Sequence, residues 1–163
     1  MLPRAQGGDP AAPAAELVRE NPLLLSGLVF AGANRRARAR DGADDGMLTA
    51  EEIAALDLEG TRWVVLSACG TALGAVRAGE GVLGLRRAFR IAGAGTVISS
   101  LWPVGDATTV SWMRQLYLER GLGHATMDAM HSANLAALGR LRARGEYPFP
   151  ATWAAFVASG DWR

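Results

Sequence analysis

The stretch Trp63-Val64-Val65-Leu66-Ser67-Ala68-Cys69-Gly70-Thr71 decides the fold of this chain. Its first four residues are apolar, and three of them are β-branched or aromatic, which predicts a short strand buried on both faces. The run ends in small residues and in the only cysteine of the sequence. We therefore expect a thiol at the carboxyl end of a parallel strand, which is where open α/β sheets bind their ligands. Gly70 allows a sharp turn there that would expose backbone N–H groups to an oxyanion.

The single cysteine has two interpretations. Free cysteines are among the most buried residue types and usually act as small apolar side chains. A catalytic cysteine instead needs a base, because an ordinary thiol with a pKa of about 8.5 is only slightly ionised at pH 7. The two histidines, His124 and His131, are distant in the sequence from any expected strand end. We expect surface or packing roles for both.

Length and composition narrow the class of protein. A chain of 163 residues is expected to form one domain with a real core. The 17 basic and 16 acidic residues nearly cancel, which gives no electrostatic case for binding nucleic acid or a membrane surface. One cysteine excludes an internal disulfide and a cysteine-based zinc site, and no apolar run is long enough to span a bilayer. We expect a cytoplasmic protein that uses no metal or cofactor.

After the strand that leads to the cysteine, the pattern predicts a helix and a second strand, with the two strands parallel. The helix is amphipathic and stops at Gly93, and the second strand covers 96–101. Thr49 and Glu52 form the pattern of a capping box at the start of a helix over 50–56. The other expected elements are a short strand near 28–31, helices over about 106–120 and 125–144, and a last strand over 153–158. In the helix over 106–120 we expect Val110, Met113, Leu116 and Tyr117 to face inward.

Three segments have sequence patterns that could indicate disorder or ligand binding. The first 20 residues are rich in Pro, Gly and Ala and predict a disordered tail or the remnant of a loop. Residues 35–45 are first basic and then acidic, which allows a phosphate-binding patch but is more typical of a solvated loop. Residues 79–84 match G-x-G-x-x-G, but the preceding strand is expected to end some ten residues earlier. Helix packing therefore explains these glycines better than dinucleotide binding does.

Four blocks of sequence carry a resemblance to a known family. They are Val64-Val65-Leu66-Ser67-Ala68-Cys69-Gly70-Thr71, Gly79-Glu80-Gly81-Val82-Leu83-Gly84-Leu85 with Ala88-Phe89, Ser100-Leu101-Trp102-Pro103-Val104, and Trp153-Ala154-Ala155-Phe156. In this order they resemble the CHAT domain, a family of caspase-like cysteine peptidases related to separases and often found after tetratricopeptide repeats. The resemblance implies that residues 21–163 are the C-terminal portion of such a domain.

The resemblance also implies a fold and a site. The fold would be a caspase-like three-layer α/β fold with a mostly parallel central sheet flanked by helices, and Cys69 would be the nucleophile acting on a protein or peptide substrate. The backbone N–H of Cys69 or Gly70 would stabilise the oxyanion. Ser100, Trp102 and Asp106 would shape the substrate pockets at the neighbouring strand end. Asp106 stands where the family commonly shows a pair of acidic residues, which is a departure from the pattern.

The catalytic histidine of the family does not occur in this sequence. In the family it is followed by glycine at the end of a strand that precedes the region where this chain begins. The sheet would therefore lack its N-terminal strands and keep an unpaired edge. Three interpretations stay open: a truncated peptidase for which Met1 is an internal codon, a split half that obtains the histidine from a partner chain, and a non-catalytic protein-interaction module in a signalling or defence assembly.

Overall fold

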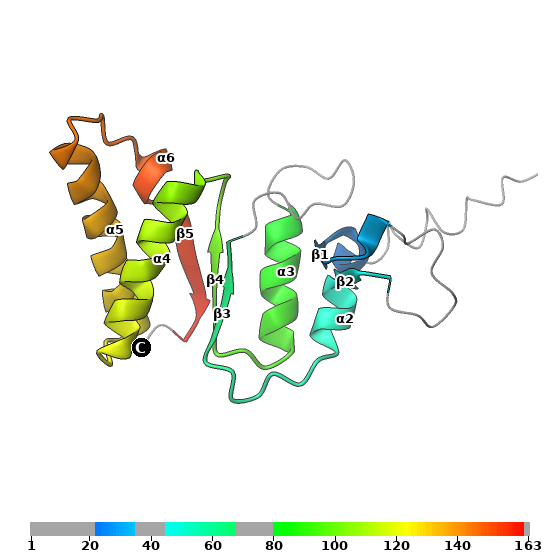
Figure 1. Cartoon of the computed structure of the whole chain (residues 1–163). Helices are drawn as coiled ribbons and strands as arrows, with labels where there is room; N and C mark the ends of the chain where they lie inside the picture. Colours follow the sequence, from blue (N-terminus) through cyan, green and yellow to red (C-terminus); the bar gives the residue numbers. More distant parts are fainter. Residues whose placement is uncertain (1–21, 35–44, 68–79, 162–163) are drawn as a thin grey trace, which may run out of the picture.

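The computed structural model describes residues 22–34, 45–67 and 80–161, and Figure 1 shows the arrangement of their helices and strands. The order along the chain is η1 (Pro22–Leu25), β1 (Gly27–Val29), β2 (Met47–Thr49), α2 (Ala50–Ala54), β3 (Trp63–Leu66), α3 (Glu80–Ile91), β4 (Thr96–Ser100), α4 (Asp106–Gly121), α5 (Thr126–Ala143), α6 (Pro150–Trp153) and β5 (Phe156–Gly160). The chain is therefore a mixed α/β protein.

A three-stranded sheet in the order β3-β4-β5 forms the centre of the molecule. β3 and β4 are parallel, with Val65 opposite Ile98, and α3 connects them as predicted. β5 runs antiparallel to β4, with Ala158 opposite Ile98. The described strands thus form a small mixed sheet, whereas a mostly parallel one was expected. The short β1 and β2 pair antiparallel in a separate sheet.

Both faces of the central sheet are covered, and the strand sequences show why. Successive side chains of a strand point to opposite faces. In β3, Trp63 and Val65 pack into one apolar cluster, while Val64 and Leu66 pack into the other. All five residues of β4 are buried, as predicted, but those of β3 are only half-buried because β3 lies at the edge of the described sheet.

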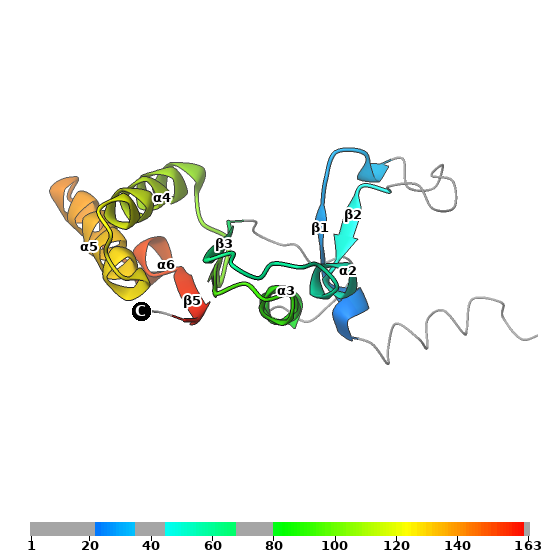
Figure 2. The ribbon, with the colours of Figure 1, turned by 90° about the horizontal axis from the view of Figure 1, so that it is seen from below.

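The helices α4 and α5 cover one face, as Figure 2 shows from below. Trp112 of α4 is buried and stacks on Phe156 of β5, with ring centroids 4.1 Å apart. Three fully or nearly buried alanines spaced four residues apart on α5, at 129, 133 and 137, let the two helices approach closely. The expected inward face of α4 was partly wrong: Leu116 is buried and Met113 is half-buried against the same cluster, but Val110 is 66% and Tyr117 55% exposed. The buried stripe instead passes through Trp112.

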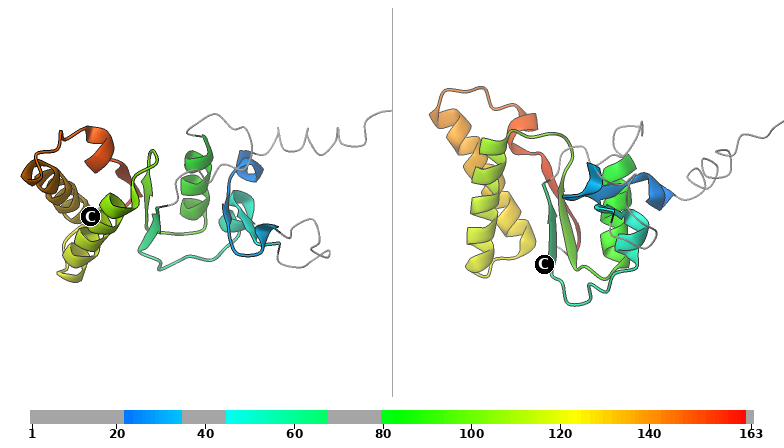
Figure 3. Two further views of the ribbon diagram at one scale, coloured as in Figure 1. Left: turned by 45° about the horizontal axis from the view of Figure 1, so that its top comes forward. Right: turned by 45° about the vertical axis from the view of Figure 1, so that its right-hand side comes forward.

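Helix α3 covers the other face and α2 packs against α3, with β1 and β2 beside α2 and away from the central sheet (Figure 3). Leu85 and Phe89 of α3 pack with Ile53 of α2 in the second apolar cluster. The capping box at the start of α2 is confirmed, since Glu52 N–H donates to Thr49 Oγ1 at 3.2 Å and Thr49 N–H donates to Glu52 Oε2 at 2.7 Å. The sequence pattern missed β2 and α6, and it placed the last strand three residues too early.

Candidate functional site

An open cleft lies where the carboxyl ends of β3 and β4 meet the first turn of α4. Its volume is about 510 Å³. The lining residues are Ser67, Pro103, Val104, Asp106, Thr109 and Val110. Ser67 directly follows β3 and is exposed, and Figure 1 shows both strands pointing toward the end of the molecule where α4 begins. The cleft therefore occupies the position at which the sequence predicts chemistry.

The predicted nucleophile and its neighbour, Cys69 and Gly70, lie outside the described residues. Ser67 is the last described residue before them, and it lines the cleft. The relation of Cys69 to this cleft accordingly remains a prediction from the sequence.

Of the three predicted pocket residues that the structure describes, Asp106 alone lines the cleft. Ser100 ends β4, is buried, and lies opposite Phe156 of β5. Trp102 is half-buried, and its Nε1–H donates to the carbonyl of Ala151 at 2.8 Å, which connects the β4–α4 loop to α6. Ser100 and Trp102 thus support the loop that carries the cleft wall.

Sequence reasoning missed the other residues of the cleft wall. Thr109 and Val110 stand three and four positions after Asp106, so the three side chains share one face of α4. This spacing, at the start of a helix that follows a strand, could have identified Thr109 and Val110 as cleft residues from the sequence. Gly105, the N-cap of α4, makes no side-chain capping bond. As in any α-helix, the first backbone N–H groups of α4 have no intrahelical partner, and here no side chain of the N-cap residue caps them either. At the edge of the cleft they favour a negative or developing negative charge.

The two histidines lie away from the cleft. Trp63 Nε1–H donates to Thr126 Oγ1 at 3.0 Å, so the start of α5 packs at the amino end of β3, opposite Ser67. His124 lies just before this contact, with Nδ1 2.5 Å from Glu119 Oε2. His131 is exposed on α5. Among the described residues, neither histidine lines the cleft.

Glu119 is the centre of a hydrogen-bond cluster at the amino end of the sheet. Its Oε1 accepts from Ser132 Oγ at 2.6 Å and from Gln115 Nε2 at 2.7 Å. Hydrogen bonds to its carboxylate lower the pKa of Glu119 below the ordinary value of 4.5. The bond from Ser132 has the largest effect, followed by those with His124 and Gln115. The carboxylate of Glu119 lies between Ser132 and His124, so His124 does not contact Ser132 as a general base would. The cluster instead connects α4 to α5.

The described segments contain neither a candidate metal site nor a candidate membrane-spanning helix. In residues 22–34, 45–67 and 80–161, no group of three or more His, Cys, Asp or Glu is placed to hold a metal ion. None of the helices in these segments is both long and apolar enough to cross a membrane.

Comparison with known protein families matches the CHAT domain to residues 13–161. A comparison with curated proteins finds no match. The matched range covers both the β3–α3–β4 unit and the helices that follow it. The chain belongs to the CHAT domain family, which is caspase-like.

Proposed function

We propose that this chain is the nucleophile-bearing part of a cysteine endopeptidase, with Cys69 as the nucleophile. The observation that carries the proposal is the cleft of about 510 Å³ that is lined by Ser67. Ser67 directly follows β3 and precedes the cysteine by two residues. Ligand sites in α/β folds lie at the carboxyl ends of strands. Membership of the CHAT domain family supports the proposal. The Ser-Ala-Cys motif after this strand also resembles the nucleophile motif of the peptidases of that family.

The proposed reaction is acyl transfer through a thioester. The thiolate of Cys69 attacks the carbonyl carbon of a peptide bond, and the backbone N–H of Cys69 or Gly70 stabilises the oxyanion. An imidazolium then protonates the leaving amine as the C–N bond breaks. Water attacks the resulting thioester and releases the acid product and the thiol. Asp106, the only charged side chain that lines the cleft among the described residues, would bind a positively charged group of the substrate.

The histidine of this mechanism would come from residues that are not in this sequence. His124 is held by Glu119 at the opposite end of β3, and His131 is exposed on α5. Among the described strands, β3 pairs only with β4, so its other edge is open to a further strand. A strand that ends in a histidine and pairs with β3 would bring its imidazole to the cleft. Such pairing would also complete a caspase-like three-layer fold with a more parallel sheet.

A second candidate function is a non-catalytic module that binds other proteins. The absence of a histidine from the described wall of the cleft favours this alternative. Both candidates use the same cleft, but only the peptidase requires the thiol. We assign either activity to the cytoplasm, where the thiol stays reduced, and expect protein or peptide ligands.

The test begins with the transcript upstream of Met1. An in-frame segment with a strand that ends in His-Gly should convert the chain into an enzyme that hydrolyses unfolded casein. Cys69→Ala should then lower the rate by at least about 10³-fold, because the nucleophile is lost. Met127→Leu, an exposed substitution at the start of α5, is the matched control and should leave the rate unchanged. Full activity of the Cys69→Ala variant would refute Cys69 as the nucleophile. No hydrolysis by the extended chain would instead leave the binding module.

A further inference from the structure

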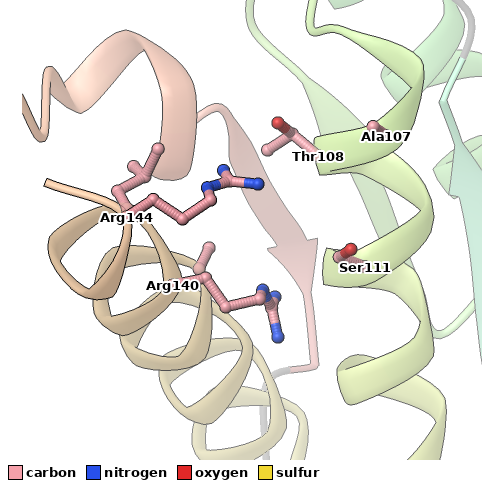
Figure 4. A pocket seen from close by; sticks show the side chains of 7 residues that line it. Ala107, Thr108, Ser111, Arg140 and Arg144 are labelled. Carbon is pink, nitrogen blue, oxygen red and sulfur yellow. The ribbon is translucent and has the colours of Figure 1, made fainter. Parts of the chain in front are cut away.

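A second cavity lies between the first two turns of α4 and the last turns of α5, and we call it the α4–α5 pocket. Figure 4 shows Arg140 and Arg144 of α5 reaching into this space toward Thr108 and Ser111 of α4. Its volume is about 120 Å³, and Ala137 is part of its lining. No acidic residue lines it among the described residues.

The pocket carries positive charge that the described chain does not fully balance. Arg140 and Arg144 are four residues apart on α5, so both guanidinium groups project from one side of the helix. Arg144 Nε contacts Glu146 Oε1 at 2.7 Å, but Arg140 forms no ion pair with a described residue. The nearest acidic residue of α4, Asp106, lines the cleft on the other face of that helix. An anion would relieve the repulsion between the two arginines.

The α4 side of the pocket offers further hydrogen-bond donors. Thr108 and Ser111 are half-buried, and their hydroxyls make no hydrogen bond with any described residue. Both side chains face the arginines in Figure 4. Two guanidinium groups on one wall and two hydroxyls on the other suit a ligand that has several acceptor oxygens and two negative charges.

We propose that the α4–α5 pocket binds a phosphate group, either as inorganic phosphate or as a phosphate monoester. A phosphate carries close to two negative charges at pH 7 and several strong acceptor oxygens, which matches the two arginines and two hydroxyls. The pocket volume of about 120 Å³ exceeds the space of one water and is below that of drug-sized ligand sites. It therefore holds one small group, and its open side lets the rest of a monoester extend into solvent.

This site is independent of the peptidase proposal but adjoins the same helix. The first two turns of α4 separate the pocket from the cleft, with Thr108 and Ser111 on one side and Asp106 and Val110 on the other. Bound phosphate would hold these turns against α5. It would do so whether or not Cys69 reacts.

The binding test uses the whole chain and sodium phosphate, followed by the Nε–Hε signals of the arginines in ¹⁵N spectra. Signals of Arg140 and Arg144 should shift and saturate with phosphate but not with sodium chloride at equal ionic strength. Arg140→Gln should weaken binding by about tenfold or more, because a charge-assisted bond is lost. Arg142→Gln is the matched control, since this exposed arginine lies on the same helix but does not line the pocket. Equal effects of the two variants would overturn the site.

A third variant tests the role of the ion pair. Glu146→Gln frees Arg144 from its carboxylate, so phosphate should bind a few times more tightly. Unchanged or weaker binding would contradict the proposed use of Arg144.

Separate titrations with O-phosphoserine and acetate identify the source of the group. Tighter binding of O-phosphoserine assigns a monoester, and tighter binding of inorganic phosphate assigns the free ion. Acetate that saturates the same two arginines with equal affinity would overturn the assignment to phosphate.

Discussion

The two ends of the central sheet differ in how their polar groups are used. At the amino end, Trp63 donates to Thr126, and the guanidinium of Arg120 lies 5.0 Å from the centre of the Trp63 ring. Glu119 accepts hydrogen bonds from neighbouring side chains at the same junction of α4 and α5. At the carboxyl end, Ser67 and Asp106 border an open cleft.

From this difference we infer that the amino end stabilises the fold, and we propose that the carboxyl end binds the ligand. The same helix, α4, reaches both ends: its last turns carry Glu119 and Arg120, and its first turn carries Asp106. Contacts at the amino end therefore fix the helix, and the fixed helix holds its first turn beside the strand ends. Substitutions at the amino end should change the free energy of unfolding, whereas those at the cleft should change binding or reaction.

The largest effect is expected at Trp63. Trp63→Ala should lower the free energy of unfolding by about 2–4 kcal/mol, because it removes packing against the α4–α5 side and the bond to Thr126. Trp63→Phe keeps the ring and should cost only about 1 kcal/mol. Urea denaturation measures both. A loss below 1 kcal/mol for Trp63→Ala would contradict the structural role of the amino end.

The next effect is expected at Gly160, which pairs with Thr96 at the amino end of β4. Its φ of +123° disfavours any side chain, and an added Cβ would clash with the carbonyl oxygen of Gly95. Gly160→Ala should therefore cost about 1–3 kcal/mol. Gly139→Ala is the matched control: it lies in α5 with open space around it and should raise stability by about 0.5–1 kcal/mol. Thermal unfolding of the two variants should move in opposite directions.

The pH dependence of stability should reflect Glu119. Because its pKa is lower in the folded chain than its ordinary value of 4.5, its ionised form stabilises the fold above that value. This stabilisation is lost as the pH falls below 4.5 through the lowered pKa. Glu119→Gln has no ionisable carboxyl group here and should show a shallower loss of stability over that range. Parallel pH profiles of the two proteins would contradict the assigned role.

The smallest effect on stability is expected at Asp106. Asp106→Asn removes an exposed charge from the first turn of α4 and should cost less than about 0.5 kcal/mol. In a polypeptide that includes the histidine, the same variant should reduce cleavage of substrates with a basic residue and spare neutral ones. Equal losses for both substrate types would show that Asp106 does not contact the substrate charge.

Local signals explain what the sequence predicted well. The β-branched run at β4, the amphipathic α3 and the Thr49–Glu52 box depend on neighbouring residues, and the structure contains all three. The antiparallel pairing of β5 depends on the return of the chain after α6, which no local pattern specifies.

The site was harder to predict because it depends on how α4 lies against the strand ends. Val110 was predicted to face the core because it is apolar. It is exposed instead, because its side of α4 borders the cleft. Ser100 was expected in a pocket from its place at a strand end, but it is buried, pairs with Phe156 of β5 and does not line the cleft. Asp106 could be named because a helix starts there directly after the loop from β4.

The catalytic role of Cys69 is tested most directly by the rate at which a peptide acyloxymethyl ketone labels this cysteine, the only one in the sequence. Folded chain and chain unfolded in urea are compared by mass spectrometry, and glutathione in the same solutions corrects for the solvent. If the cleft orients a peptide and stabilises the oxyanion beside Cys69, the folded chain should react at least tenfold faster, even without a histidine. Equal corrected rates, or slower labelling of the folded chain, would contradict a catalytic role for this cysteine.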